Sequence, residues 1–137
     1  MCAIRTFIDT NILVYAFTSD EPLKKRDALY FLDNCLPVIS TQVAREFSNV
    51  ILKKTNFDSQ YVKDVINEIT SVAEVVSEEI PLIIEALDLR TRYSYSFYDC
   101  LILAVALSSN CKVLLSEDMQ NGQIIDDSLL ISNPFVA

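Results

Sequence analysis

Short apolar runs alternate along this chain with longer segments in which apolar residues recur every three or four positions. The short runs have the length of buried strands, and the longer segments have the spacing of helices that bury one face. We therefore expect strands at these positions: 5–8, 37–40, 73–76, 111–115 and, as a short edge strand, 129–132. Strands that alternate with helices are typical of a mainly parallel sheet with helices on both faces.

The longer segments predict helices with these bounds: 12–17, 22–34, 41–55, 59–72, 77–92 and 97–109. We expect Ser40 or Thr41 to cap the third helix. Pro37 is expected at the first residue of its strand, because proline has no N–H to donate to a neighbouring strand. Glu78 and Glu79 fall in the expected first turn of the fifth helix, where acids interact favourably with the helix dipole.

Four acidic residues follow a strand or lie in the first turns of a helix: Asp9, Glu46, Asp99 and Asp118. Taken alone, Asp9 in the polar turn 9–11 is best explained as a helix cap. Glu46 is less ordinary, since it lies on the apolar face of its helix. Asp99 opens a helix that is apolar on almost every side, where a carboxylate has to be capped, paired or bound to a metal.

The carboxyl ends of parallel strands meet at one edge of a sheet, so these acids are expected to converge. Several carboxylates in one crevice repel one another and raise each other's pKa unless a cation lies between them. Ligands that offer only oxygen suit Mg²⁺ or Mn²⁺. Such cations are the usual apparatus of phosphodiester hydrolysis, because they lower the pKa of a bound water and neutralise charge in the transition state.

Composition narrows the chemistry further. The 137 residues, 51% of them hydrophobic, are enough for one folded domain, 1–137, with its own core. The chain has no histidine, which excludes Ser-His-Asp and Cys-His nucleophiles and His-ligated metal sites. Gly122 is the single glycine, so neither a phosphate-binding loop nor a dinucleotide-binding motif is present. A net charge of −8 argues against a protein that coats nucleic acid, but not against a cation-dependent enzyme that cleaves it.

The four cysteines, at positions 2, 35, 100 and 111, lack the close spacing of a zinc site and are expected to be buried free thiols. No signal peptide is recognisable, because the chain runs from Met1 straight into the first strand. The longest apolar stretch, 101–107, falls well short of the roughly 20 residues that a bilayer span needs. These features predict a soluble cytoplasmic protein.

Several stretches carry a resemblance to a known family. They are FIDTNILVY (7–15), the helix of Glu46, YDCLILAVA (98–106) and LLSEDM (114–119). Together they keep the order and spacing of all four acids, and they resemble the PIN-domain ribonucleases. The compact length and the ending DMQNG (118–122) resemble, more narrowly, the VapC toxins of type II toxin–antitoxin systems.

This resemblance implies a three-layer α/β/α fold with a mainly parallel central sheet. It implies a Mg²⁺- or Mn²⁺-dependent endoribonuclease that cleaves RNA, often tRNA or ribosomal RNA, and it also implies a cognate antitoxin and a homodimer. By position, the family's acidic quartet corresponds to Asp9, Glu46, Asp99 and Asp118. We expect Asp9 and Asp99 as direct metal ligands, and Glu46 and Asp118 as further or water-mediated ligands.

Asn11 and Ser116 match polar positions that help to arrange the quartet in this family. Glu117, beside Asp118, is expected to be exposed. The acidity of the chain leaves the RNA path to a few basic residues, each of which taken singly is better explained as plain surface: Arg45, Lys53, Lys54, Arg90 and Arg92.

Other carboxylate-based families fit less well. A haloacid-type phosphatase and a proofreading-type exonuclease both resemble patterns with a second acid two residues after the first, where this chain has Asn11. A response-regulator receiver needs paired acids after its first strand and a lysine near its last, and neither is evident. The remaining alternative is a PIN-like binding or scaffold module without catalysis. It ranks second because all four acids are present.

Overall fold

Strands and helices alternate along the chain, which the structure, a computed structural model, describes over residues 3–54 and 56–136. The strands are β1 (Arg5–Ile8), β2 (Leu36–Ser40), β3 (Glu74–Val76), β4 (Val113–Leu115), β5 (Ile124–Ile125) and β6 (Leu129–Ser132). The helices are α1 (Thr10–Ala16), α2 (Pro22–Asp33), α3 (Thr41–Lys54), α4 (Ser59–Val72), α5 (Ile80–Arg92) and α6 (Phe97–Ser108). The expected bounds agree with these to within three residues. Cys2 and the expected helix end at Thr55 lie outside the described residues.

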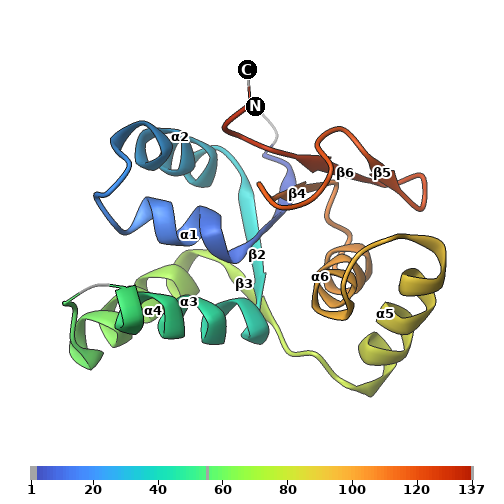
Figure 1. Cartoon of the computed structure of the whole chain (residues 1–137), viewed down its shortest axis with the longest axis horizontal. Helices are drawn as coiled ribbons and strands as arrows, with labels where there is room; N and C mark the ends of the chain where they lie inside the picture. Colours follow the sequence, from blue (N-terminus) through green and yellow to red (C-terminus); the bar gives the residue numbers. More distant parts are fainter. Residues whose placement is uncertain (1–2, 55, 137) are drawn as a thin grey trace.

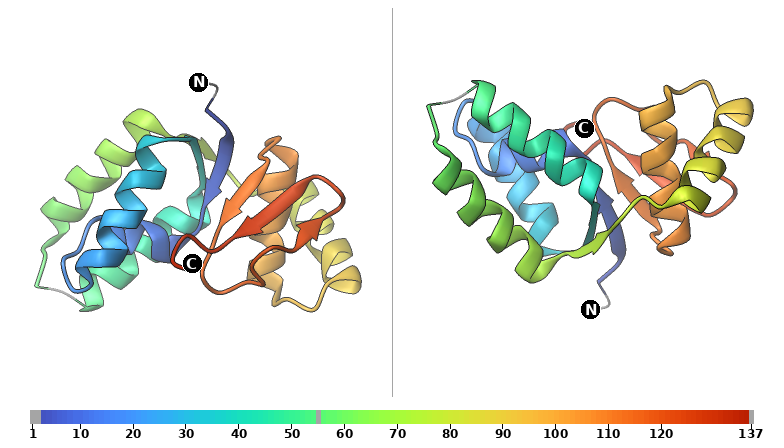
Figure 2. Two further views of the ribbon diagram at one scale, coloured as in Figure 1. Left: turned by 90° about the horizontal axis from the view of Figure 1, so that it is seen from above. Right: turned by 90° about the horizontal axis from the view of Figure 1, so that it is seen from below.

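One sheet separates the helices into two groups (Figure 1). Its strands follow the order β3-β2-β1-β4-β6-β5, and all neighbours are parallel except β5 and β6. Helices α1 to α4 lie on one side of the sheet, and α5 and α6 lie on the other (Figure 2). The predicted three-layer α/β/α fold with a mainly parallel sheet is confirmed.

Strand β1 lies inside the sheet, between β2 and β4. Its residues Phe7 and Ile8 are fully buried. Beyond the strand, the Asp9 N–H still donates to the Leu115 carbonyl at 3.0 Å, which extends the pairing with β4 by one residue. The carboxyl ends of these three parallel strands share one edge, from which α1, α3 and the segment 116–118 depart. Three of the four predicted acids lie on these departing segments.

The C-terminal strands differ from the expectation in one respect. The segment 129–132 is predicted as an edge strand, but β6 is internal, because it pairs with β4 on one side and with β5 on the other. The edge strand on this side of the sheet is β5, which has two residues. The turn that follows β5 holds Asp126 and Asp127 at φ values of 47° and 59°, a left-handed conformation that aspartate adopts more readily than most residues.

Pro37 is the second residue of β2, not the first as expected. The N–H of Leu36 donates to the Ile4 carbonyl on the β1 side at 2.9 Å. Successive N–H groups of a strand point to opposite sides, so the N–H that Pro37 lacks would face β3. Strand β3 begins only opposite Val38, and the proline therefore breaks no hydrogen bond of the sheet.

Helix α6 is buried on nearly every side, and every residue from 100 to 106 is buried. This confirms the expectation from its almost uniformly apolar sequence. Cys100 and Cys111 are buried free thiols, as expected, whereas Cys35 is only partly buried. Over residues 3–54 and 56–136, no helix combines the length and apolar character needed to cross a membrane.

Glu78 and Glu79 do not lie in the first turn of a helix, because α5 begins only after them. Glu79 occupies the N-cap position of α5 but makes no side-chain hydrogen bond there. The Glu78 carboxylate accepts hydrogen bonds from the Thr41 hydroxyl at 2.8 Å and from the Gln42 N–H at 2.7 Å. Its side chain is only 6% exposed, and Arg45 lies 3.9 Å away. Glu78 therefore caps α3, the helix that carries Glu46.

Replacing Glu78 with alanine should lower the free energy of unfolding by about 1–3 kcal/mol, because two donors at the start of α3 lose a charged acceptor. Glu79→Ala is the matched control and should change this free energy by no more than about 0.5 kcal/mol. Urea unfolding followed by circular dichroism measures both variants. Equal losses would contradict the capping role of Glu78.

Candidate active site

The four predicted acids line one small pocket at the carboxyl edge of the sheet. Its volume is about 150 Å³, and its lining consists of Asp9, Thr10, Asn11, Gln42, Glu46, Val50, Tyr98, Asp99, Ile102 and Asp118. These residues come from the start of α1, from α3, from the first turns of α6 and from the loop after β4. The fold brings every acid of the predicted quartet to this acid pocket.

Asp9 is the most buried of the four acids, with 7% of its surface exposed. Its carboxylate accepts hydrogen bonds from the Ser116 hydroxyl at 2.8 Å and from the Thr10 N–H at 2.7 Å, so it also caps α1. Ser116 is fully buried, and its hydroxyl oxygen accepts the Asp118 N–H at 3.2 Å. Ser116 therefore links two of the acids, and the two interpretations of Asp9, cap and candidate ligand, are compatible.

Glu46 is held from two sides. One carboxylate oxygen accepts the Thr10 hydroxyl at 3.0 Å, and the other accepts the Gln42 side-chain amide at 2.8 Å. Ser40 caps the helix that carries both residues, since its hydroxyl oxygen accepts the Val43 N–H at 3.2 Å. Two hydrogen bonds from different elements thus fix the orientation of the Glu46 carboxylate.

Gln42 and Thr10 are site residues that the sequence analysis missed. Gln42 precedes Glu46 by four residues, which is one helical turn, and this spacing is a signal for a side-chain contact. Thr10 carries no such signal, because it reaches Glu46 from a different element. Gln42 is 4% exposed, and its Oε1 atom has no hydrogen-bond partner among the residues that the structure describes.

Asp99 lies in the first turn of α6. Its N–H donates to the hydroxyl oxygen of Ser96, the N-cap residue of α6, at 3.2 Å. Burial raises the pKa of the Asp99 carboxyl above its usual 3.8, the Ser96 hydroxyl lowers it, and the charges of Asp118 and Glu46 raise it further. Asp118 is exposed, and its carboxylate accepts the Asn11 side-chain amide at 3.2 Å.

Glu117 is not exposed, contrary to the expectation, since only 17% of its side chain is accessible to solvent. Its carboxylate accepts hydrogen bonds from Lys24 at 3.0 Å and from the Tyr15 hydroxyl at 2.5 Å. The Lys24 ammonium also lies over the rings of Tyr15 and Phe135, 4.7 and 5.2 Å from their centroids. Glu117 is thus neutralised outside the acid pocket, which only its neighbour Asp118 lines.

The acids of the pocket act on one another as like charges. Burial raises the pKa of Asp9 from its usual 3.8 to about 6. The hydrogen bonds from Ser116 and Thr10 lower this pKa, and the charges of Asp118 and Asp99 raise it. A positive charge in the pocket would relieve this repulsion.

A model of the PIN domain matches residues 6–121, a range that contains all four acids. The chain belongs to the PIN domain family. No curated protein matches it.

Solved structures with the same fold come from toxin–antitoxin systems. A toxin–antitoxin complex from Klebsiella pneumoniae matches with a TM-score of 0.72 at 19% identity, over 95% of this chain and 98% of that chain. VapC20 of Mycobacterium tuberculosis, a sarcin–ricin loop cleaving toxin, matches with 0.68 at 17%, over 82% and 91%. VapBC2 from Rickettsia felis, bound to a DNA fragment from the promoter, matches with 0.68 at 19%, over 95% and 98%. The resemblance to PIN domains, and in fold to VapC toxins, is confirmed.

The donor set of this PIN domain fits a hard divalent cation, because the four acids of the pocket offer only oxygen. Within the described part of the chain, no three His, Cys, Asp or Glu side chains are grouped closely enough to hold a metal ion. Mg²⁺ does not require such a group, since it usually keeps several waters and binds one or two carboxylates. Burial, and after it the charges of neighbouring acids, raise the pKa of Asp9 and of Asp99, so these are the carboxylates that a cation would stabilise most.

Asp9→Asn should stabilise the metal-free PIN domain at neutral pH. Because the pKa of Asp9 is higher in the folded than in the unfolded chain, its favourable contribution is complete below about pH 4 and is lost as the pH rises through about 6. In chelator, the variant should gain about 2–3 kcal/mol in free energy of unfolding at pH 7.5, and little at pH 4. Thermal unfolding at several pH values measures this gain.

Asp118→Asn is the control for this prediction, because it removes a charge from the same pocket at an exposed position. Its stability gain at pH 7.5 should be clearly smaller. A gain for Asp9→Asn that does not depend on pH would contradict the assignment to the buried charge.

Proposed function

We propose that residues 1–137 act as a single PIN-like domain that hydrolyses RNA phosphodiester bonds as a metal-dependent endoribonuclease. The observation that carries the proposal is the acid pocket, where four carboxylates from distant parts of the chain meet: Asp9, Glu46, Asp99 and Asp118. Membership of the PIN domain family supports a nuclease. The residues that fix these carboxylates support a site that is organised before its cation binds.

In this proposal Asp9 and Asp99 bind Mg²⁺ or Mn²⁺ directly, and Glu46 and Asp118 bind it as further or water-mediated ligands. The cation, when bound, lowers the pKa of a water molecule and neutralises charge on the reacting phosphate. The chain's own contribution is orientation, because supporting hydrogen bonds keep ligating carboxylates in place.

These supporting hydrogen bonds divide among four residues. Ser116 and the Thr10 N–H hold Asp9, the Thr10 hydroxyl and Gln42 hold Glu46, and Asn11 holds Asp118. The supporting roles proposed for Asn11 and Ser116 are thus consistent with direct contacts to the acids.

We further propose that the protein is the toxin of a type II toxin–antitoxin pair in the cytoplasm, with tRNA or ribosomal RNA as its target and a cognate antitoxin as its partner. The toxin–antitoxin complexes among its structural neighbours, and the neighbour described as a sarcin–ricin loop cleaving toxin, support this role. A homodimer is proposed as well. Exposed apolar residues of α5 at Ile80, Ile84 and Leu87 recur on one helix face and offer a surface for a protein partner.

The decisive experiment is cleavage of total RNA by purified protein with Mn²⁺, with Mg²⁺ and with chelator. The wild type should give discrete fragments only with a metal ion. Asp99→Asn should lower the rate by at least about 100-fold, since residues that merely support metal ligands already contribute 10–100-fold. Primer extension or gel analysis of the fragments measures the rate.

Glu117→Gln is the matched control, because Glu117 is adjacent to Asp118 in sequence but does not line the acid pocket. This variant should keep the wild-type rate. No cleavage by folded, partner-free wild type with either ion would contradict the proposal and favour a binding module. Equal cleavage by wild type and Asp99→Asn would indicate a contaminating nuclease.

Gln42→Leu tests the orientation of Glu46 separately from folding. The leucine removes the hydrogen bond to Glu46 but also removes a buried carbonyl oxygen that has no partner in the described residues, so stability should change little. The cleavage rate should fall by roughly 10-fold or more. Parallel measurement of melting temperature and rate checks this, and an unchanged rate would contradict the role of Gln42.

A further inference from the structure

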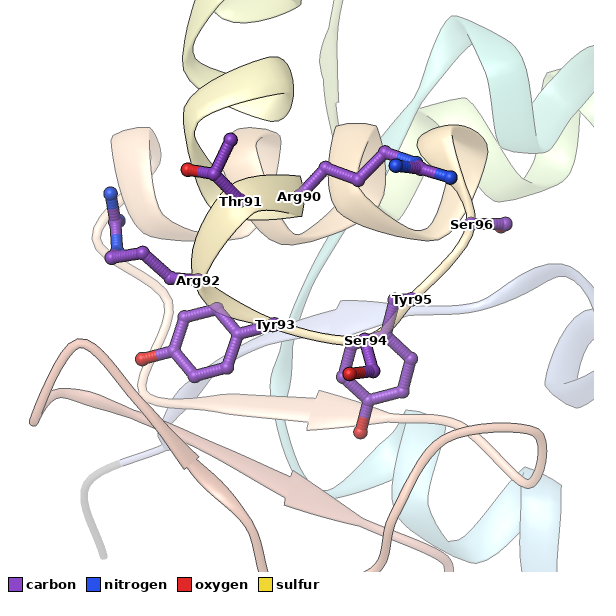
Figure 3. Close-up of a pocket in the computed structure, with 7 residues that line it drawn as sticks. All are labelled: Arg90, Thr91, Arg92, Tyr93, Ser94, Tyr95 and Ser96. Carbon is purple, nitrogen blue, oxygen red and sulfur yellow. The ribbon is translucent and has the colours of Figure 1, made fainter.

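A second, larger hollow lies where α5 ends and α6 begins (Figure 3). Its volume is about 500 Å³, and the consecutive residues 90–96 line it. We call it the junction hollow. None of the four acids lines it, and its lining includes two arginines, Arg90 and Arg92, in a chain whose net charge is −8.

Arg92 and Tyr93 have structural partners. The Arg92 guanidinium pairs with Asp126 at 2.8 Å and lies 3.9 Å from Glu85. The Tyr93 hydroxyl donates to the Asp126 carboxylate at 3.1 Å and accepts the Asp126 N–H at 2.9 Å. Both side chains therefore serve to attach the end of α5 to the turn after β5.

Three more side chains of the junction hollow are also engaged. The Tyr95 hydroxyl donates to the side-chain oxygen of Gln123 and accepts the Gln120 N–H at 3.1 Å. The Thr91 hydroxyl donates to a carbonyl of its own helix at 2.6 Å, and Ser96 caps α6. These contacts hold residues 91–96 in place before any ligand binds, which lowers the entropy lost on binding.

Arg90 and Ser94 are the two exceptions. Both are exposed, and neither side chain forms a hydrogen bond or an ion pair with any residue of 3–54 or 56–136. Figure 3 shows the Arg90 side chain extending from the end of α5 toward Ser96, whereas Arg92 extends to the other side. A guanidinium offers several N–H donors in a planar array that matches two phosphate oxygens, and a serine hydroxyl adds one more donor.

The junction hollow adjoins the acid pocket at the start of α6. Ser96 lines the hollow, and Tyr98 and Asp99, two and three residues later, line the acid pocket. One helical turn therefore separates the two linings. Tyr98 is 63% exposed, and an exposed aromatic ring beside a cleavage site offers a surface on which a base can stack.

We infer that the junction hollow binds a backbone phosphate of the RNA beside the one that is cleaved, with Arg90 as the phosphate-binding residue and Ser94 as a second donor. This inference rests on the proposed ribonuclease function. Arg90 is here a positioning residue, which aligns the strand along α6 and takes no part in the hydrolysis. It places one positive charge on the path of a polyanion that the net charge of the protein would otherwise repel.

The test is the salt dependence of RNA binding by the full chain. Short single-stranded RNA of mixed sequence, labelled with fluorescein, is titrated in Ca²⁺ in place of Mg²⁺ or Mn²⁺, with a gel to verify that it stays intact. Arg90→Gln should reduce the slope of log affinity against log salt by about 0.7, the value of one single-strand phosphate contact, and weaken binding about fivefold at 0.1 M salt. Its melting temperature should equal that of the wild type.

Arg92→Gln is the matched control from the same hollow. It should lower the melting temperature, because it breaks the contacts to Asp126 and Glu85, and leave the salt slope unchanged. Arg90→Lys should retain the slope, since a lysine also supplies a positive charge. Wild-type slope and affinity in Arg90→Gln, or an equal loss of slope in Arg92→Gln, would overturn the inference.

The inference and the proposed function fail in different ways. If the wild type cleaves total RNA with a metal ion while Arg90→Gln binds RNA with the wild-type slope, only the phosphate site is overturned. If the folded wild type neither binds the labelled RNA nor cleaves total RNA, the ribonuclease proposal is overturned and the phosphate site with it.

Discussion

The buried carboxylate of Asp9 is the constraint on which the rest of this site depends. It stands at the end of a central strand that is paired on both sides, and the bond of its own N–H to Leu115 fixes its backbone. The hydrogen bonds from Ser116 and the Thr10 N–H hold its side chain. Burial raises its pKa to about 6, and only the hydrogen bonds from Ser116 and Thr10 offset this shift. The fold thus holds the Asp9 carboxylate in a buried position, where an isolated charge is unfavourable.

Residues next to Asp9 also hold the site in one arrangement at the expense of stability. The side-chain amide of Gln42 donates a hydrogen bond to Glu46, but its side-chain oxygen is buried and has no hydrogen-bond partner among the described residues. Asp99 adds a partly buried acid to the head of an otherwise apolar helix. Each of these features lowers the stability of the fold. Such features concentrate at functional sites, where they are retained because the function requires them.

Much of this fold could be predicted from the sequence, because the spacing of apolar residues within a helix or strand is set by neighbouring positions along the chain. The internal position of β6 could not, since two residues of β5 carry too little pattern to indicate a further strand. The four acids could be found from their places after strands and at helix starts. Thr10, which reaches Glu46 across the fold, and Glu78, which caps α3 from the loop after β3, could not, because their partners lie 36 and 37 residues away.

The net charge of −8 conflicts with the proposed RNA substrate only if charge is counted over the whole chain. Locally, Glu117 is paired with Lys24, Asp126 with Arg92, and Glu78 accepts hydrogen bonds at the start of α3 and lies 3.9 Å from Arg45. Among the described residues around the start of α6, the acid pocket, which we propose to bind a cation, and Arg90, which we propose to bind a phosphate, are left without an opposite charge. A bound divalent cation would offset two of the four negative charges of the acid pocket, and Arg90 would add one positive charge beside it, for the RNA strand that we propose as substrate. The sign of the net charge is therefore a weaker guide to the ligand than the short list of groups that the fold leaves unpaired.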